Sequence, residues 1–143
     1  MGIMERLLLQ LESLTKPQIA YSTQKQKSGT NKFQYITIPN PNKYWFHNGA
    51  TGDLNGDGLE DYFVGASSND VGKLYLQTTT GFIESNIPDF KKTLISEDVG
   101  ATIFDVDQDG DNDLYVVSGG YEFEVNSKWL QDRLYINDGK GNL

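Results

Sequence analysis

The chain has 143 residues, of which 37% are hydrophobic and 12% aromatic, so it can bury a core and should be globular rather than disordered. Twenty acidic residues against twelve basic ones give a formal net charge of −8, which argues against nucleic acid as a partner because phosphate backbones are bound by clustered Lys and Arg. Cysteine is absent, and this excludes disulfides, thiolate metal sites and cysteine nucleophiles.

Residues 1–16 are expected to form a short amphipathic helix, because apolar side chains recur at positions 3, 4, 7, 8, 11 and 14. The simplest interpretation is a helix that covers an open edge of the fold, and a helix that binds a partner is the alternative. The apolar run at residues 7–9, like the others in the chain, is far below the roughly 20 residues that span a bilayer, so no membrane span is expected. Glu5, Gln10 and Glu12 interrupt the apolar stretch that a secretory signal needs, so no signal is expected in this chain.

A unit of about 50 residues then occurs more than once. Each copy has a Gly-Ala-Thr triplet, an acidic phrase, a β-branched and aromatic run, a second short apolar run and a Gly-containing turn. The two acidic phrases, DLNGDGLED and DVDQDGDND, start 52 positions apart. The matching segments are 49–51 and 100–102, 53–61 and 105–113, 61–64 and 113–117, 73–77 and 133–137, and 78–81 and 138–141.

This period, with several short strands in each unit, predicts an all-β chain of β-propeller blades, each a four-stranded antiparallel meander. We expect residues 17–47 to form a partial preceding blade, with strands near 19–22 and 33–38. Residues 48–98 should form a complete blade, and residues 99–143 a second blade truncated before its fourth strand. About two blades cannot close a ring of four to eight, so the chain is expected to be a fragment of a larger propeller. Alternatively it is an open array whose edges pair with further blades or with another chain.

The acidic phrases have the donor pattern of a cation loop. Oxygen-bearing side chains occupy positions 1, 3, 5 and 9, which are Asp53, Asn55, Asp57 and Asp61 in the first copy and Asp105, Asp107, Asp109 and Asp113 in the second. Glycine at position 6 permits the sharp bend that returns position 9 to the centre, and the main-chain carbonyl of position 7, Leu59 or Asp111, would complete an all-oxygen shell. Such a shell, without His or Cys, selects Ca²⁺, so two calcium sites are expected.

The phrases have two alternative interpretations. An EF-hand needs a bidentate Glu at position 12 between two helices, but that position is Val64 or Val116, each inside an apolar β run. A polar turn that binds nothing is the other interpretation. It is disfavoured because three or four carboxylates about 4 Å apart would repel by several kcal/mol without a cation.

Residues 49–65, GATGDLNGDGLEDYFVG, resemble the FG-GAP/VCBS repeats of integrin-α-like propellers. The second copy, with LQDRLYINDGKGN at 130–142, is similar to VCBS-containing surface proteins of bacteria, and the resemblance extends over residues 33–143. It implies a full propeller of about seven blades, calcium in the loop between the first and second strands, and an extracellular or cell-surface location.

A ligand face is expected opposite the calcium loops. The segment 118–132 is about eight residues longer than its counterpart 66–72 and carries Tyr121, Phe123 and Trp129. Long aromatic loops on a rigid scaffold commonly bind ligands or sugars, and the resemblance implies partners on this face; the alternative is that these rings pack over the blade.

Catalysis is not expected, since His47 is the sole histidine and no base or nucleophile can be placed beside it. The expected function is a calcium-stabilised, non-enzymatic segment of an extracellular recognition or adhesion protein with a protein or glycan ligand. The alternatives are an accessory propeller of a larger secreted polysaccharide-active enzyme, or a lectin.

Overall fold

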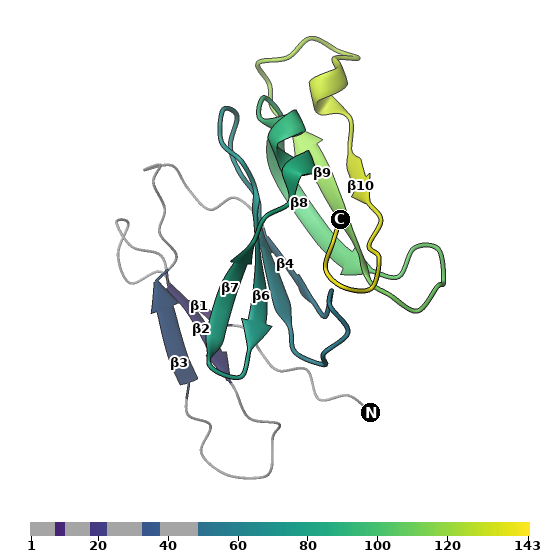
Figure 1. Ribbon diagram of the computed structural model, residues 1–143. Coiled ribbons are helices and arrows are strands. Elements are labelled where there is room, and N and C mark those ends of the chain that lie inside the picture. The colour runs from purple at the N-terminus through teal and green to yellow at the C-terminus, as the bar shows by residue number, and fades with distance from the viewer. Residues whose placement is uncertain (1–7, 11–17, 23–32, 38–48) are drawn as a thin grey trace. The chain divides into compact units, whose positions relative to one another are not determined.

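The computed structural model describes residues 8–10, 18–22, 33–37 and 49–143, whose strands lie in three sheets (Figure 1). The chain divides into two compact units, residues 1–43 with 78–82, and residues 44–77 with 83–143. Within the described ranges, no helix is long and apolar enough to span a membrane. The described part of the chain is mostly β with little helix, as the sequence predicted.

The first unit contains a three-stranded antiparallel sheet of β1 (Leu8–Gln10), β2 (Gln18–Ser22) and β3 (Phe33–Thr37), in the order β1-β2-β3. The strands predicted near 19–22 and 33–38 are confirmed. The helix predicted over residues 1–16 is wrong at Leu8–Gln10, which pairs with β2 instead. A short apolar run fits a strand as well as a helix, and here pairing with the following strand decides. The rest of that predicted helix lies outside the described residues.

A four-stranded sheet consists of β4 (Gly49–Gly52), β5 (Asp61–Val64), β6 (Lys73–Thr78) and β7 (Gly81–Ser85). The order is β4-β5-β6-β7, so each strand lies beside its neighbour in sequence. Every residue of β5 is buried, which explains its unbroken apolar and aromatic run after Asp61. The four strands predicted within residues 48–98 are therefore present.

The next sheet consists of β8 (Glu97–Phe104), β9 (Asp113–Gly119) and β10 (Arg133–Tyr135), in the order β10-β9-β8 and antiparallel. The 3₁₀ helix η1 (Pro88–Thr93) precedes β8, and η2 (Lys128–Leu130) precedes β10. The three strands predicted within residues 99–143 are present, and the first starts earlier than Gly100 because residues from Glu97 onward also pair with β9.

The sheet of β4 to β7, called the first sheet below, and the sheet of β8 to β10, called the second sheet, share one hydrophobic core. Phe63 and Leu74 of the first sheet and Leu114 and Val116 of the second are all buried in it. Phe90 of η1 closes the core, and its ring meets Phe63 and Tyr135 edge-on at centroid distances of 5.5 and 5.1 Å. The remaining buried members are Leu54 and Ile87. Consecutive repeats are thus packed face to face.

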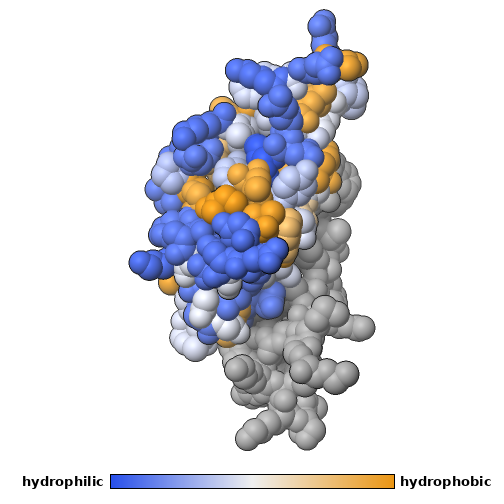
Figure 2. All heavy atoms as spheres, turned by 90° about the vertical axis from the view of Figure 1, so that its right-hand side faces the viewer, coloured by the Kyte–Doolittle hydropathy of each residue, from blue (hydrophilic) through white to orange (hydrophobic). Residues whose placement is uncertain are grey.

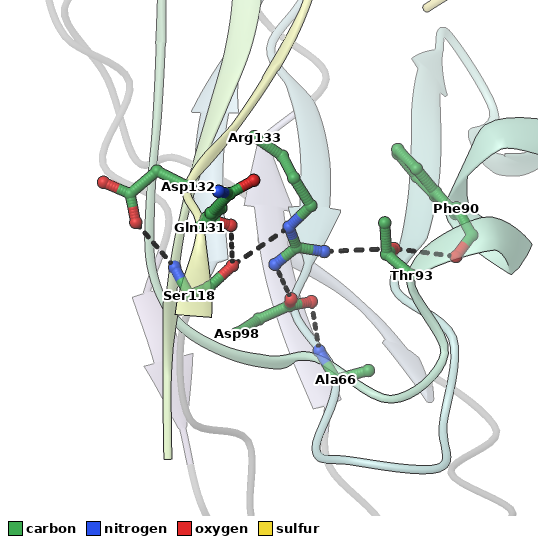
Figure 3. A network of polar contacts seen from close by, with 8 residues as sticks. All are labelled: Ala66, Phe90, Thr93, Asp98, Ser118, Gln131, Asp132 and Arg133. Atoms are coloured by element: carbon green, nitrogen blue, oxygen red, sulfur yellow. Dashed lines mark hydrogen bonds and ion pairs between the residues drawn. The ribbon is translucent and has the colours of Figure 1, made fainter. Parts of the chain in front are cut away.

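A buried polar network also joins the two repeats (Figure 3). Asp98 at the start of β8 forms an ion pair with Arg133 of β10, and its second carboxylate oxygen accepts a 2.7 Å hydrogen bond from the Ala66 amide. The Arg133 guanidinium also donates to Ser118 Oγ at 3.2 Å and to Thr93 Oγ1 at 3.1 Å. This network lies at the end of the second sheet opposite the acidic turn between β8 and β9.

Candidate metal centre in two acidic loops

The two acidic phrases form equivalent connections. Loop one (residues 53–61) joins β4 to β5, and loop two (residues 105–113) joins β8 to β9. In each loop, position 9 is the first residue of the second strand, Asp61 or Asp113. The sequence repeat is therefore also a structural repeat, with one acidic loop between the first two strands of each sheet.

Both loops bend at the same two positions. Position 4 has φ of 73° at Gly56 and 66° at Gln108, and position 6 has φ of 82° at Gly58 and 99° at Gly110. Glycine accommodates this left-handed region without strain, which explains why the bend predicted at position 6 falls on a glycine in both loops. The bend at position 4 was not predicted, because glutamine does not indicate a left-handed residue.

The carboxylate at position 1 organises each loop. Asp53 accepts hydrogen bonds from the amides of Gly56 at 2.7 Å, Asp57 at 3.1 Å and Gly58 at 2.7 Å. Asp105 accepts in the same way from Gln108 at 2.7 Å and Gly110 at 3.1 Å. Position 1 therefore lies inside the turn, as a cation ligand at this position must.

Side chains at positions 3 and 5 each fold back on the amide two residues later. In loop one, Asn55 accepts from Asp57 at 3.0 Å, and Asp57 accepts from Leu59 at 2.8 Å. In loop two, Asp107 accepts from Asp109 at 3.3 Å, and Asp109 accepts from Asp111 at 3.0 Å. The structure thus aligns positions 3 and 5 of both loops despite the Asn in one and the Asp in the other.

Loop two brings three of its predicted ligands together: carboxylate oxygens of Asp105, Asp107 and Asp109 all lie within 4.8 Å of one another. Loop one has an amide among its carboxylates, and Asn55 Nδ2 donates to Asp57 Oδ2 at 3.2 Å. The candidate donors are all oxygens, with no imidazole or thiolate in either loop. This donor chemistry fits a hard divalent cation, and oxygen ligands in this number are typical of Ca²⁺.

Desolvation and neighbouring negative charge raise the pKa of one carboxyl in each loop. The pKa of the Asp107 carboxyl is raised by partial desolvation and by the charges of Asp109, Asp113 and Asp105, and a backbone hydrogen bond from Asp109 opposes the rise. Burial also raises the pKa of Asp61 to about 6, assisted by Asp57 and Asp53 and opposed by its backbone hydrogen bonds. A bound cation would offset this repulsion and favour the ionised carboxylates.

The aspartates at position 9 have a role that the sequence did not indicate. Asp61 and Asp113 are 0% and 1% exposed, and both oxygens of each carboxylate accept backbone hydrogen bonds. For Asp61 the donors are the backbone amides of Leu54, at position 2 of the loop, and Gln77, near the end of β6. For Asp113 they are the backbone amides of Val106, at position 2, and Asn137, just after β10. Position 9 therefore fastens each loop to its sheet. Its assignment as a cation ligand stays a prediction, as do the carbonyl ligands of Leu59 and Asp111.

The three predicted ligand-face aromatics lie on the connection between β9 and β10, at the other end of the second sheet from loop two. Tyr121 is fully exposed, whereas Phe123 and Trp129 are half-buried. Lys128 Nζ lies 4.3 Å from the centre of the Trp129 ring, within the range of a cation–π contact. His47 lies outside the described residues.

A family model described as FG-GAP-like repeat matches residues 53–116. The match starts at the first residue of loop one, contains all of loop two and ends within β9. It confirms the resemblance to FG-GAP repeats over this segment. No curated protein matches the chain.

Proposed function

We propose, from the membership of residues 53–116 in the FG-GAP-like repeat family, that the second unit is a segment of a β-propeller in which loops one and two each bind a structural Ca²⁺. The observation that carries this proposal is the same loop conformation occurring twice, with three carboxylates of loop two within 4.8 Å of one another. Bound calcium would be held by the side chains at positions 1, 3 and 5 and would offset the negative charge of the aspartates among them. The aspartate at position 9 holds each loop to its sheet. The side chain of Leu54, 1% exposed, anchors loop one in the core.

Calorimetric titration of the full chain with CaCl₂ tests the proposal. We expect two sites with dissociation constants of roughly 10⁻⁴ to 10⁻³ M, the range of extracellular calcium modules. Loop two should bind more tightly, because it has four aspartates at positions 1, 3, 5 and 9 where loop one has three and an asparagine. Asp109→Ala should therefore remove the tighter site and Asp57→Ala the weaker one. Absence of binding heat would overturn the proposal, and equal losses in the two variants would overturn the ranking.

The packing of the repeats supports a longer array. Phe63 and Leu74 of the first sheet are buried under the second sheet, and their repeat equivalents are Tyr115 and Leu134, which pair with each other across β9 and β10. Tyr115 is partly exposed and Leu134 is 46% exposed, and the neighbouring Phe104 is 42% exposed. Figure 2, which views the molecule from this side, shows an apolar patch bordered by hydrophilic residues. We propose that a further repeat of the same kind covers this face.

A location outside the cell and a role in recognition or adhesion complete the proposal. The expected calcium affinity suits an environment rich in Ca²⁺, and the long connection between β9 and β10 exposes Tyr121 to solvent. The specific candidate ligand is a glycan, favoured by this exposed ring and the half-buried Trp129 on the same connection. Binding on a glycan array that is lost in Trp129→Ala and kept in Lys92→Ala, a surface variant outside this connection, would support the glycan; no binding would leave a protein partner as the proposal.

A further inference from the structure

The residue after β10 links the two acidic loops directly. Asn137 is 4% exposed, and its side-chain amide donates to the carbonyl oxygen of Leu54 in loop one at 2.6 Å. The same nitrogen donates to the carbonyl oxygen of Asn112 in loop two at 2.8 Å. Its side-chain oxygen accepts from the Gly141 amide at 3.1 Å, which fixes the orientation of the amide group. One buried asparagine therefore holds the backbone of both loops.

A second asparagine makes a parallel link. Asn112, at position 8 of loop two, donates from Nδ2 to the carbonyl oxygen of Asp53 at 2.9 Å. Asp53 is position 1 of loop one, whose side chain organises that loop. The two asparagines thus hold the consecutive carbonyls of Asp53 and Leu54, directly after the position 1 carboxylate along the chain.

The turn 138–141 packs against both loops as well. A Cβ built on Gly139 would come within 2.2 Å of Asp111 Oδ2 in loop two, so the turn and that side chain are in close contact. The carbonyl oxygen of Gly139 lies 3.8 Å from a Cβ built on Gly56 in loop one. A Cβ on Gly141 would lie 3.6 Å from Cβ of Asn55. The turn therefore packs beside both loops, next to the two asparagines that link them.

We propose that Asn112 and Asn137 are positioning residues that couple the two acidic loops, so that ordering loop two pre-organises loop one. The buried carbonyl of Leu54 and the part-buried carbonyl of Asp53 accept hydrogen bonds from these donors, and leaving such groups unpaired is costly. The consequence for cation binding, positive cooperativity between the loops, rests on the proposed calcium sites. The mechanical coupling does not depend on calcium.

The cation test is a thermodynamic cycle on the full chain, with calcium binding to loop one followed by NMR at the Gly58 amide. In the natural sequence, Asp109→Ala should weaken calcium binding at loop one by about 5- to 10-fold, a coupling of the usual size between linked sites. In an Asn112→Ala background, and separately in Asn137→Ala, the same change should have a smaller effect, because one of the two links between the loops is lost. Asn142→Ala is the matched control: its side-chain amide donates to Asp138 within the same turn and the coupling should persist. A ratio near 1 in the natural sequence, or an unchanged ratio in both asparagine variants, would overturn the proposal.

A calcium-free readout separates this inference from the proposed function. The amides of Gly56, Asp57 and Gly58 donate to Asp53, so their hydrogen-exchange protection reports the order of loop one. Their protection should fall at least 5-fold in Asn112→Ala and stay unchanged in Asn142→Ala. If no variant binds calcium but protection falls in this way, the calcium sites fail and the coupling stands. If calcium binds but protection is equal in the two variants, the coupling fails.

Discussion

Asp98 and Arg133, the first on β8 and the second on β10, form an ion pair that is almost fully withdrawn from solvent, with side chains 4% and 15% exposed. In Figure 3 the guanidinium also donates hydrogen bonds to two hydroxyl groups on other segments, those of Thr93 in η1 and Ser118 on β9. Because Asp98 also holds the Ala66 amide of the preceding repeat, this pair fixes how consecutive repeats join at the end away from the acidic loops.

Removing one partner of this pair should be far more costly than removing a surface pair. Arg133→Ala leaves the Asp98 charge buried without its partner, and we expect a loss of about 3 to 5 kcal/mol in the free energy of unfolding. Lys92→Ala breaks the exposed pair with Asp89, 72% and 49% exposed, and should cost at most about 0.5 kcal/mol. Urea unfolding of the two variants measures the difference. Similar losses in both would show that the buried pair does not join the repeats.

The left-handed residue at position 4 of loop two gives a prediction of opposite sign. Gln108 has φ of 66°, where Gly56 stands at the same position of loop one with φ of 73°. Gln108→Gly should relieve this strain and stabilise the chain by up to about 1 kcal/mol. Gln108→Ala, which keeps a Cβ, should leave stability nearly unchanged.

Gly110 tests the same backbone argument at position 6. It has φ of 99°, and a Cβ built there would meet no atom within 4 Å. Gly110→Ala should therefore destabilise by about 1 to 2 kcal/mol through backbone strain alone. Thermal melting of this variant beside the Gln108 variants is the measurement, and an unaffected melting temperature would contradict the shared loop conformation.

Alkaline pH should destabilise the chain through Tyr62. Burial raises the pKa of its hydroxyl from 10.0 to about 12, and the ring is only 3% exposed. Because the folded-state pKa is the higher one, the contribution is fully present below pH 10 and is lost as pH rises through 12. This loss should amount to roughly 2 to 3 kcal/mol. Tyr62→Phe removes the titrating group, so the fall in unfolding free energy between pH 10 and 12 should be smaller by that amount. An equal fall in both proteins would exclude Tyr62 as the cause.

Local patterns in the sequence predicted much of the second unit. The runs 61–64, 73–77 and 113–117 and the start of 133–137 are strands, because apolar and β-branched residues between glycine turns indicate them directly. The donor pattern also predicted that Asp105, Asp107 and Asp109 would gather. Both predictions depend on residues that are close in sequence.

Features that depend on distant contacts were not predictable in this way. Leu8–Gln10 is a strand because it pairs with β2, which its own short apolar run does not reveal. Asn137 reaches Leu54 across 83 positions, and nothing in the local sequence distinguishes it from a turn asparagine. Asp61 and Asp113 follow the spacing of cation ligands, but the backbone donors that surround them come from other strands.

Thermal melting of the full chain with calcium and with a chelator tests the central claim most directly. At a calcium concentration about 100-fold above the dissociation constant, each site should add about 2.7 kcal/mol, which raises the melting temperature by several degrees. The double variant Asp57→Ala, Asp109→Ala should lose this rise, and the Asn142→Ala control should keep it. A melting temperature that is the same with calcium and with chelator, or a rise of equal size in the double variant, would contradict calcium binding in the acidic loops.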